Sequence, residues 1–276
     1  MNRTGEIVRD QNQDMLHKST KTRTMLWILL VLIVVLIMIV MSVLSDSSNN
    51  PIPNNSRQMI VVRTPSWTAS KGFMQCFERS ANDGEWAVCG SKVPIILGRN
   101  GLAWGRGLHS IPDDTHPVKH EGDGKSPAGV FRLGDAFGIP TIEDIGALDI
   151  PYKPVTEFLE CVDDVHSQYY NQMVDNSKVE VIDWDSSERI HRSPNAYHFA
   201  VMINHNTVNT QKGAGSCIIL HCVSVNGDST AGCTTMSRDE MENVLKWLDK
   251  GKNPVLVQLP ESEYLRLKNH WELPDF

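Results

Sequence analysis

The chain has 276 residues, of which 41% are hydrophobic and 21% are charged. This composition is typical of a globular protein with one domain and additional terminal segments. The formal net charge of -7 argues against nucleic acid as the main partner, because nucleic-acid-binding proteins present a basic face.

The N-terminal part of the chain predicts a membrane anchor. Residues 1–24 are polar with mixed charges, and residues 25–44 contain no charged side chain. A helix of that length spans the ~30 Å hydrocarbon core of a bilayer. The basic residues before it favour a cytoplasmic tail at 1–24, and the run is long for a cleaved signal. Residues 45–58 are rich in Ser, Asn and Pro, which predicts an unpacked linker to a globular part at 59–276.

Short apolar runs separated by turn residues predict β-strands in the first half of the globular part. Residues 59–62 are the first of these, and the runs 73–77 and 86–89 flank the turn signal at 82–84. Further strands are expected at 93–97 and 130–133. The Gly-rich segment 98–107 lacks the Gly-Lys-Ser/Thr ending and the following helix of a phosphate-binding loop, so it is interpreted as turns between strands, and residues 122–129 are interpreted as a similar tight turn.

Residues 139–194 show the least regular pattern of the globular part. We expect loops and short helices that form one wall of a substrate cleft. Acidic pairs such as Asp163-Asp164 are interpreted as solvated surface rather than paired catalytic carboxylates. The aromatic side chains of Tyr169, Tyr170 and Trp184 either contact substrate or pack against the domain.

The C-terminal part contains two more strands and two helices. The strand at 197–206 alternates apolar and polar residues, and another is expected at 254–259. Ser237 and Glu240 fit a capping box that starts a helix ending near Gly251. A short helix is expected around 261–269. Many short strands with few helices predict a mainly β sandwich or barrel.

The most specific pattern lies between Gly215 and Met236. An apolar strand at 217–223 contains His221, and after a polar turn the small-residue corner 230–233 presents Cys233. A neighbouring imidazole lowers the pKa of a thiol and takes its proton, which produces a nucleophile. Gly232 allows close backbone approach, and the amides near Gly232 and Cys233 are candidate oxyanion donors. His198 and His205 are weaker candidates for the base, because they lack this context.

Two alternatives to catalysis fit the same residues. Cysteine is often simply buried in the core. A zinc site would use Cys217, His221, Cys222 and Cys233, but alternation along the strand places Cys222 on the opposite face, and no Cys-x-x-Cys pair is present.

The pairing of the six cysteines stays open at this stage. Cys76 and Cys89 flank the turn of the first hairpin, where they either form a disulfide or pack as two thiols. If Cys233 is a free nucleophile, Cys161 has Cys217 or Cys222 as a candidate partner.

The His221 strand followed by Thr230-Ala231-Gly232-Cys233 resembles the L,D-transpeptidase (YkuD-type) catalytic domain. A second block, at 97–101 and 121–131, resembles the early hairpin region of that family, and the resemblance covers about residues 90–260. Ala231 and Thr234-Thr235 depart from the commoner family pattern, which has His before the Gly and Asn or Arg after the Cys. The sequence is therefore identified as a divergent branch, with a YkuD-like β-sandwich or barrel expected.

The resemblance implies a peptidoglycan enzyme that needs no metal or cofactor. Cys233 would attack the bond before the terminal D-Ala of a tetrapeptide stem, with His221 as base and Gly232 at the oxyanion site. Thr230, Tyr197 and Asn206 would contact the stem peptide. An amine is the expected acceptor; the alternatives are water, which gives an L,D-carboxypeptidase, and a non-catalytic wall-binding module. The implied location is the inner membrane, single-pass, with the catalytic domain in the periplasm.

Overall fold

The computed structural model describes residues 27–38, 50–81, 84–112, 116–224, 227 and 229–276, in two units divided after Asn49. Residues 27–38 of the first unit are helical. Of the helices within these described ranges, none has both the length and the apolar character to cross a bilayer. The predicted anchor at 25–44 extends beyond the described residues at both ends, and the predicted tail at 1–24 lies outside them.

The second half of the predicted linker is part of the folded domain. Ile52 is only 4% exposed, and the Arg57 amide donates a hydrogen bond to the Lys252 carbonyl oxygen. The Arg79 side chain donates to the carbonyl oxygen of Ser56. The polar composition of 50–57 predicted a linker. The contacts could not be predicted from the sequence, because the partner residues lie far away along the chain.

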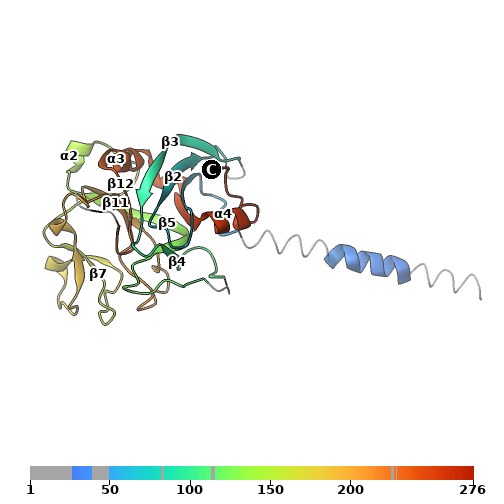
Figure 1. Cartoon of the computed structure of the whole chain (residues 1–276), viewed down its shortest axis with the longest axis horizontal. Helices are drawn as coiled ribbons and strands as arrows, with labels where there is room; N and C mark the ends of the chain where they lie inside the picture. Colours follow the sequence, from blue (N-terminus) through green and yellow to red (C-terminus); the bar gives the residue numbers. More distant parts are fainter. Residues whose placement is uncertain (1–26, 39–49, 82–83, 113–115, 225–226, 228) are drawn as a thin grey trace, which may run out of the picture. The chain divides into compact units, whose positions relative to one another are not determined.

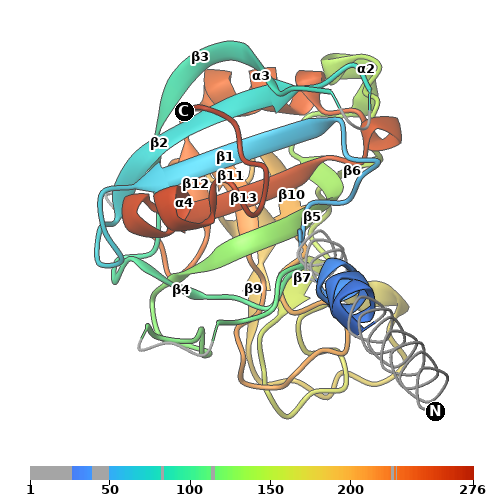
Figure 2. The ribbon, with the colours of Figure 1, turned by 90° about the vertical axis from the view of Figure 1, so that its right-hand side faces the viewer.

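One large sheet forms the body of the domain (Figure 1, Figure 2). Its strand order is β10-β11-β12-β3-β2-β1-β13-β5-β4, with β6 beside β5. These strands are β1 (Gln58–Thr64), β2 (Lys71–Glu78), β3 (Ala87–Ile96), β4 (Leu102–Trp104), β5 (Ser126–Gly138), β6 (Tyr152–Pro154), β10 (Phe199–Ile203), β11 (Ile219–Cys222), β12 (Thr234–Met236) and β13 (Val255–Pro260).

The sheet closes on itself, because β10 pairs with β5 as well as with β11. The prediction of a mainly β fold with few helices is therefore confirmed, and the arrangement is barrel-like. The α-helices of the domain are α2 (Ile142–Ile145), α3 (Arg238–Trp247) and α4 (Glu261–Leu267), and the 3-10 helices are η2 (Asn176–Lys178), η3 (Ile190–Arg192) and η4 (Lys250–Lys252). Helix α3 packs against β10 and β11, and α4 packs against β13 and β1. Ser237 caps α3 by accepting a hydrogen bond from the Glu240 amide, as predicted.

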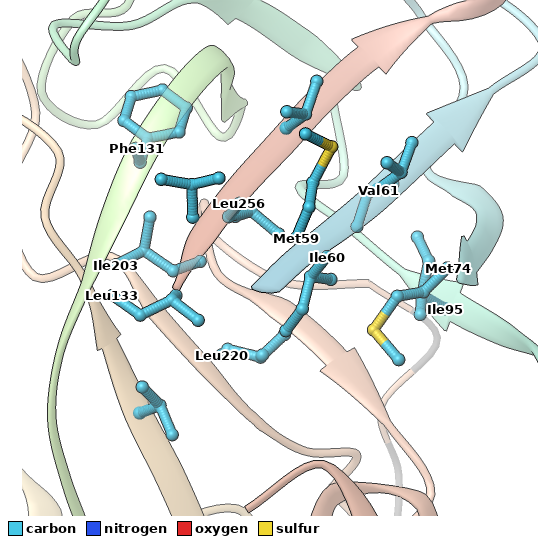
Figure 3. Close-up of a cluster of buried hydrophobic side chains, with 14 of the residues drawn as sticks. Met59, Ile60, Val61, Met74, Ile95, Phe131, Leu133, Ile203, Leu220 and Leu256 are labelled. Atoms are coloured by element: carbon cyan, nitrogen blue, oxygen red, sulfur yellow. The ribbon is translucent and has the colours of Figure 1, made fainter. Parts of the chain in front are cut away.

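Apolar side chains from the strands fill the interior (Figure 3). Ile60, Leu133, Leu220 and Leu256 are each at most 1% exposed, although they come from four different strands. Strand β13 is buried at every position, which is why it is a continuous apolar run with a single polar residue, Gln258, rather than an alternating pattern.

A second, three-stranded sheet lies in the region where loops were expected. It has the order β8-β7-β9, with β7 (Leu159–Val162), β8 (Met173–Asp175) and β9 (Ser187–Arg189). Both views place it below β11 and β12, at one end of the domain (Figure 1, Figure 2). These strands are three or four residues long, so their sequence carries too few positions for a period to be recognised.

A disulfide joins this small sheet to the main one. Cys161 of β7 is bonded to Cys217, just before β11, with their Cα atoms 5.9 Å apart. Cys222, the second candidate partner of Cys161, is a free thiol that donates a hydrogen bond to the Phe199 carbonyl oxygen. Cys76 and Cys89 are register partners across β2 and β3, yet both are free thiols, so of the two alternatives for this pair the structure has packed thiols.

This pairing predicts the number of free thiols. Of six cysteines, two are in the disulfide, so four are expected to react with a thiol reagent in the unfolded, unreduced protein, and six after reduction. Peptide mapping by mass spectrometry should recover Cys161 linked to Cys217. A count of two, with Cys76 linked to Cys89, would contradict the structure.

Candidate active site

The parallel pairing of β11 with β12 brings His221 and the Cys233 corner together. His221 is in register with Thr235, and Cys233 immediately precedes β12. Both side chains line one cavity of about 220 Å³, together with Tyr197 and Thr230. His221 and Cys233, twelve positions apart in sequence, therefore line the same cavity, and the hydrogen-bond contact expected between them stays a prediction.

His221 is oriented and neutral. Its Nδ1 lies 2.8 Å from the Cys222 carbonyl oxygen, which can only accept, so Nδ1 carries the proton and Nε2 keeps its lone pair. The Tyr197 ring packs on the imidazole with ring centroids 4.9 Å apart. Burial lowers the pKa of His221 to about 4, despite hydrogen bonds to backbone carbonyls that act in the opposite direction. The imidazole is therefore an unprotonated base at neutral pH.

Cys233 is a protonated thiol in this state of the protein. It is 8% exposed, and its Sγ donates to the Cys217 carbonyl oxygen at 3.5 Å. Burial, assisted by the nearby Glu188 carboxylate, raises the pKa of the Cys233 thiol to about 12. This corrects the expectation that the neighbouring imidazole lowers the thiol pKa, since desolvation of the thiolate is the larger effect.

The Thr230–Cys233 corner is held by the side chain of Thr230. Its hydroxyl donates to the Cys233 carbonyl oxygen at 2.6 Å and accepts from the Gly232 amide at 3.1 Å. Of the two predicted oxyanion donors, the Gly232 amide is thus already engaged, and the Cys233 amide is the better candidate. A Cβ on Gly232 would lie 3.1 Å from the Lys125 carbonyl oxygen, so a side chain at this position would crowd that carbonyl.

The comparison with known protein families agrees with this geometry. The model of the YkuD family, described as the L,D-transpeptidase catalytic domain, matches residues 90–257. This chain belongs to that family. The match contains His221, Cys233 and the second sequence block, which confirms the resemblance seen in the sequence. No curated protein and no solved structure matches the chain.

Residues of the second sequence block, 97–101 and 121–131, hold the backbone of the Cys233 corner by hydrogen bonds. Ser126 donates its hydroxyl to the Cys233 carbonyl oxygen at 3.1 Å and accepts from the Gly98 amide at 2.9 Å. Next to it, Thr234 donates to the Gln258 side chain, which in turn donates to the Pro127 carbonyl oxygen. The two separated sequence blocks of the family therefore meet at one buried hydrogen-bond network around the Cys233 corner.

Asn206 does not line the cavity of Cys233. Its amide nitrogen donates to the carbonyl oxygens of Gln211 and Gly215, and its amide oxygen accepts from Arg106 and the Gln211 amide. All its hydrogen-bonding capacity is used within the loop, which replaces the predicted substrate contact by a structural role. His205 is similarly engaged, between the Arg106 amide and the Ala214 carbonyl oxygen.

The alternative zinc site is not assembled. Cys217 is consumed by the disulfide with Cys161, and the Cys222 thiol points to the Phe199 carbonyl oxygen. Only His221 and Cys233 of the four candidate ligands share the cavity.

Glu188 is a cavity residue that the sequence did not single out. It lines the cavity beside Cys233 and accepts a hydrogen bond from the Tyr197 hydroxyl. It reaches this position because β9 pairs with β7, with Glu188 in register with Cys161. In the sequence it stands in an acidic, polar stretch without periodicity, so no local signal distinguishes it from its neighbours.

The raised thiol pKa predicts slow alkylation of Cys233 in the substrate-free protein. At pH 7 we expect iodoacetamide to modify Cys233 more slowly than the more exposed Cys89, because only the thiolate reacts. The rate should rise about tenfold per pH unit without a plateau below pH ~10. Peptide mass spectrometry measures both sites in one sample. A plateau near neutral pH would show a preformed thiolate–imidazolium pair instead.

Proposed function

We propose that this YkuD domain is a peptidoglycan L,D-transpeptidase with Cys233 as nucleophile and His221 as general base. The observation that carries the proposal is the shared cavity, in which a neutral imidazole and a protonated thiol lie together at the junction of β11 and β12. Family membership supplies the substrate class, the stem peptide of peptidoglycan.

The neutral pair favours proton transfer during attack. As the thiol sulfur approaches the carbonyl carbon before the terminal D-Ala, Nε2 of His221 takes the thiol proton. The Cys233 amide stabilises the oxyanion that forms. His221 then gives the proton to the leaving amine of D-Ala, and the stem remains attached to Cys233 as a thioester.

An amine acceptor resolves the thioester and produces a cross-link. The amine attacks the thioester carbonyl, the C–S bond breaks, and the Cys233 thiol is restored with a proton passed through His221. Tyr197 and Thr230 line the cavity and each positions one of the two reactive side chains. The Tyr197 ring packs on the imidazole, and the Thr230 hydroxyl fixes the corner that carries the thiol.

We also infer that residues 25–44 anchor the enzyme in the inner membrane with its catalytic domain in the periplasm. The twenty uncharged positions have the length of a membrane span. The Cys161–Cys217 disulfide supports an oxidising compartment for the domain, because disulfides rarely persist in the cytosol. The linker is short, so the enzyme would work near the membrane surface.

The activity is tested with purified protein and a disaccharide tetrapeptide. Wild type is expected to form a dimer with loss of one D-Ala, and Cys233→Ala is expected to form none, because Cys233 carries the one thiol among the described residues that line the cavity. Cys89→Ala, which removes a free thiol from β3, is the matched control and should retain the product. Mass spectrometry identifies the products. A tripeptide without dimer would indicate a carboxypeptidase, and no product with no Cys233 adduct would favour a wall-binding module.

The anchor is tested by cell fractionation. The full chain is expected in the membrane fraction, resistant to salt extraction, and a chain lacking residues 1–44 in the soluble fraction. The apolar side chains of 25–44 provide the difference. Recovery of the full chain in the soluble fraction would contradict the proposal.

A further inference from the structure

Of the described residues that line the cavity of Cys233, Glu188 is the one with a carboxylate, and the mechanism above does not use it. The remaining lining is supplied mainly by Ser, Thr and Ala side chains together with Tyr197 and His221. Glu188 is half-buried, and its carboxylate is close enough to Cys233 to raise the thiol pKa. A carboxylate that opposes formation of the thiolate does not assist the first attack, so any part it has in the reaction lies in a later step.

Glu188 also borders a second, larger cavity. This open cavity of about 670 Å³ shares Glu188 and Ser193 with the cavity of Cys233. Its other charged side chains are three carboxylates and two guanidinium groups, those of Glu160, Asp163, Asp185, Arg189 and Arg192. Glu188 therefore lies at the border between the open cavity and the cavity of Cys233, so a molecule bound in the open cavity would contact Glu188 on its way to the thioester.

Several of these carboxylates already have partners, and Glu188 retains free capacity. Glu160 accepts hydrogen bonds from Asn176 and Ser187, and Asp163 accepts one from Ser186. Glu188 accepts one hydrogen bond, at Oε1, from the Tyr197 hydroxyl. A carboxylate has about four acceptor positions, and among the described residues no hydrogen bond to Oε2 of Glu188 is found, so this oxygen can accept from a ligand in the cavity of Cys233.

The second half of the reaction needs such a group. A primary amine has a pKa near ~10.4 in water and arrives as an ammonium ion, which cannot attack a carbonyl. His221 is neutral, because burial lowers its pKa to about 4, so it carries no charge that would attract an ammonium ion. The half-buried carboxylate of Glu188 attracts the ammonium by its opposite charge, and burial raises its pKa, which favours its acting as a proton acceptor.

We propose that Glu188 binds the acceptor of the transfer reaction, pairing with the ammonium of an incoming primary amine and taking one of its protons. This inference rests on the proposed transpeptidase function and deepens it by naming the residue that binds the acceptor amine. The freed amine attacks the Cys233 thioester, the C–N bond forms and the C–S bond breaks. A second proton passes from the nitrogen through His221 to the sulfur, and Glu188 then releases its proton to solvent.

The assignment is tested by competition between nucleophiles in the full-length protein. Wild type and Glu188→Gln receive the same tetrapeptide donor, with either a stem peptide carrying a free primary amine or hydroxylamine, which is uncharged at neutral pH. Mass spectrometry gives the ratio of aminolysis to hydrolysis product. This ratio does not depend on the fraction of active protein or on the rate of the first attack.

Glu188→Gln is expected to lower the ratio for the ammonium acceptor at least ~10-fold, as for loss of a general base. The ratio for hydroxylamine should stay within about threefold, because a neutral nucleophile has no proton to lose before attack. Glu180→Gln, an exposed carboxylate that lines neither cavity, is the matched control and should leave both ratios unchanged. Glu188→Asp keeps the negative charge and is the milder second variant. With the ammonium acceptor, its ratio of aminolysis to hydrolysis product should be higher than that of Glu188→Gln.

Tyr197→Phe separates a direct role from a positioning one. It removes the hydroxyl that donates to Glu188 but leaves the carboxylate, so the ammonium ratio should be retained. A selective loss in Tyr197→Phe with the ratio of Glu188→Gln unchanged would assign the effect to the tyrosine hydroxyl and would overturn the inference. An unchanged ammonium ratio in Glu188→Gln would overturn it as well, with the transpeptidase function intact. If wild type gives no product with amine, hydroxylamine or water, the proposed function fails and the inference fails with it.

Discussion

The parallel pairing of β11 with β12 sets the position of both reactive side chains. It places His221 in register with Thr235, two residues beyond Cys233, and so turns a separation of twelve positions into one shared cavity. The pair is held in the main sheet by β10 on one side and by β3 on the other. The Ser126 and Gln258 hydrogen bonds fix the Cys233 corner from within the sheet. A change that loosened β12 would therefore disturb the nucleophile before it disturbed the fold.

Burial of this junction determines how the chemistry proceeds. The same loss of water raises the thiol pKa of Cys233 and lowers the imidazole pKa of His221, so both groups are neutral at physiological pH. A neutral pair is unreactive toward small electrophiles but ready for a proton transfer coupled to attack. In the proposed reaction, selectivity would come from the substrate that brings a carbonyl to the thiol, rather than from a permanently activated nucleophile.

The small sheet adds a second layer to the site. The main sheet provides Cys233 and His221, whereas β9 of the small sheet provides Glu188, and the disulfide from Cys161 to Cys217 ties the two together beside the nucleophile. The Cys217 carbonyl oxygen accepts from the Cys233 thiol, so this one residue contacts both layers. The division matches the two halves of the proposed reaction: the main sheet forms the thioester, and the small sheet receives the acceptor.

Features that depend on neighbours along the chain are predictable from the sequence alone. These are the strand with His221, the small-residue corner with Cys233, the Ser237 cap of the following helix, and the mainly β character. The folded structure was needed to see that Glu188 reaches the cavity, that Asn206 does not, and that Cys161 pairs with Cys217. Their partners lie tens of residues away, and no local period or turn signal encodes such a contact. The pKa of Cys233 belongs to the same group, because it depends on how much water the folded chain removes from the thiol.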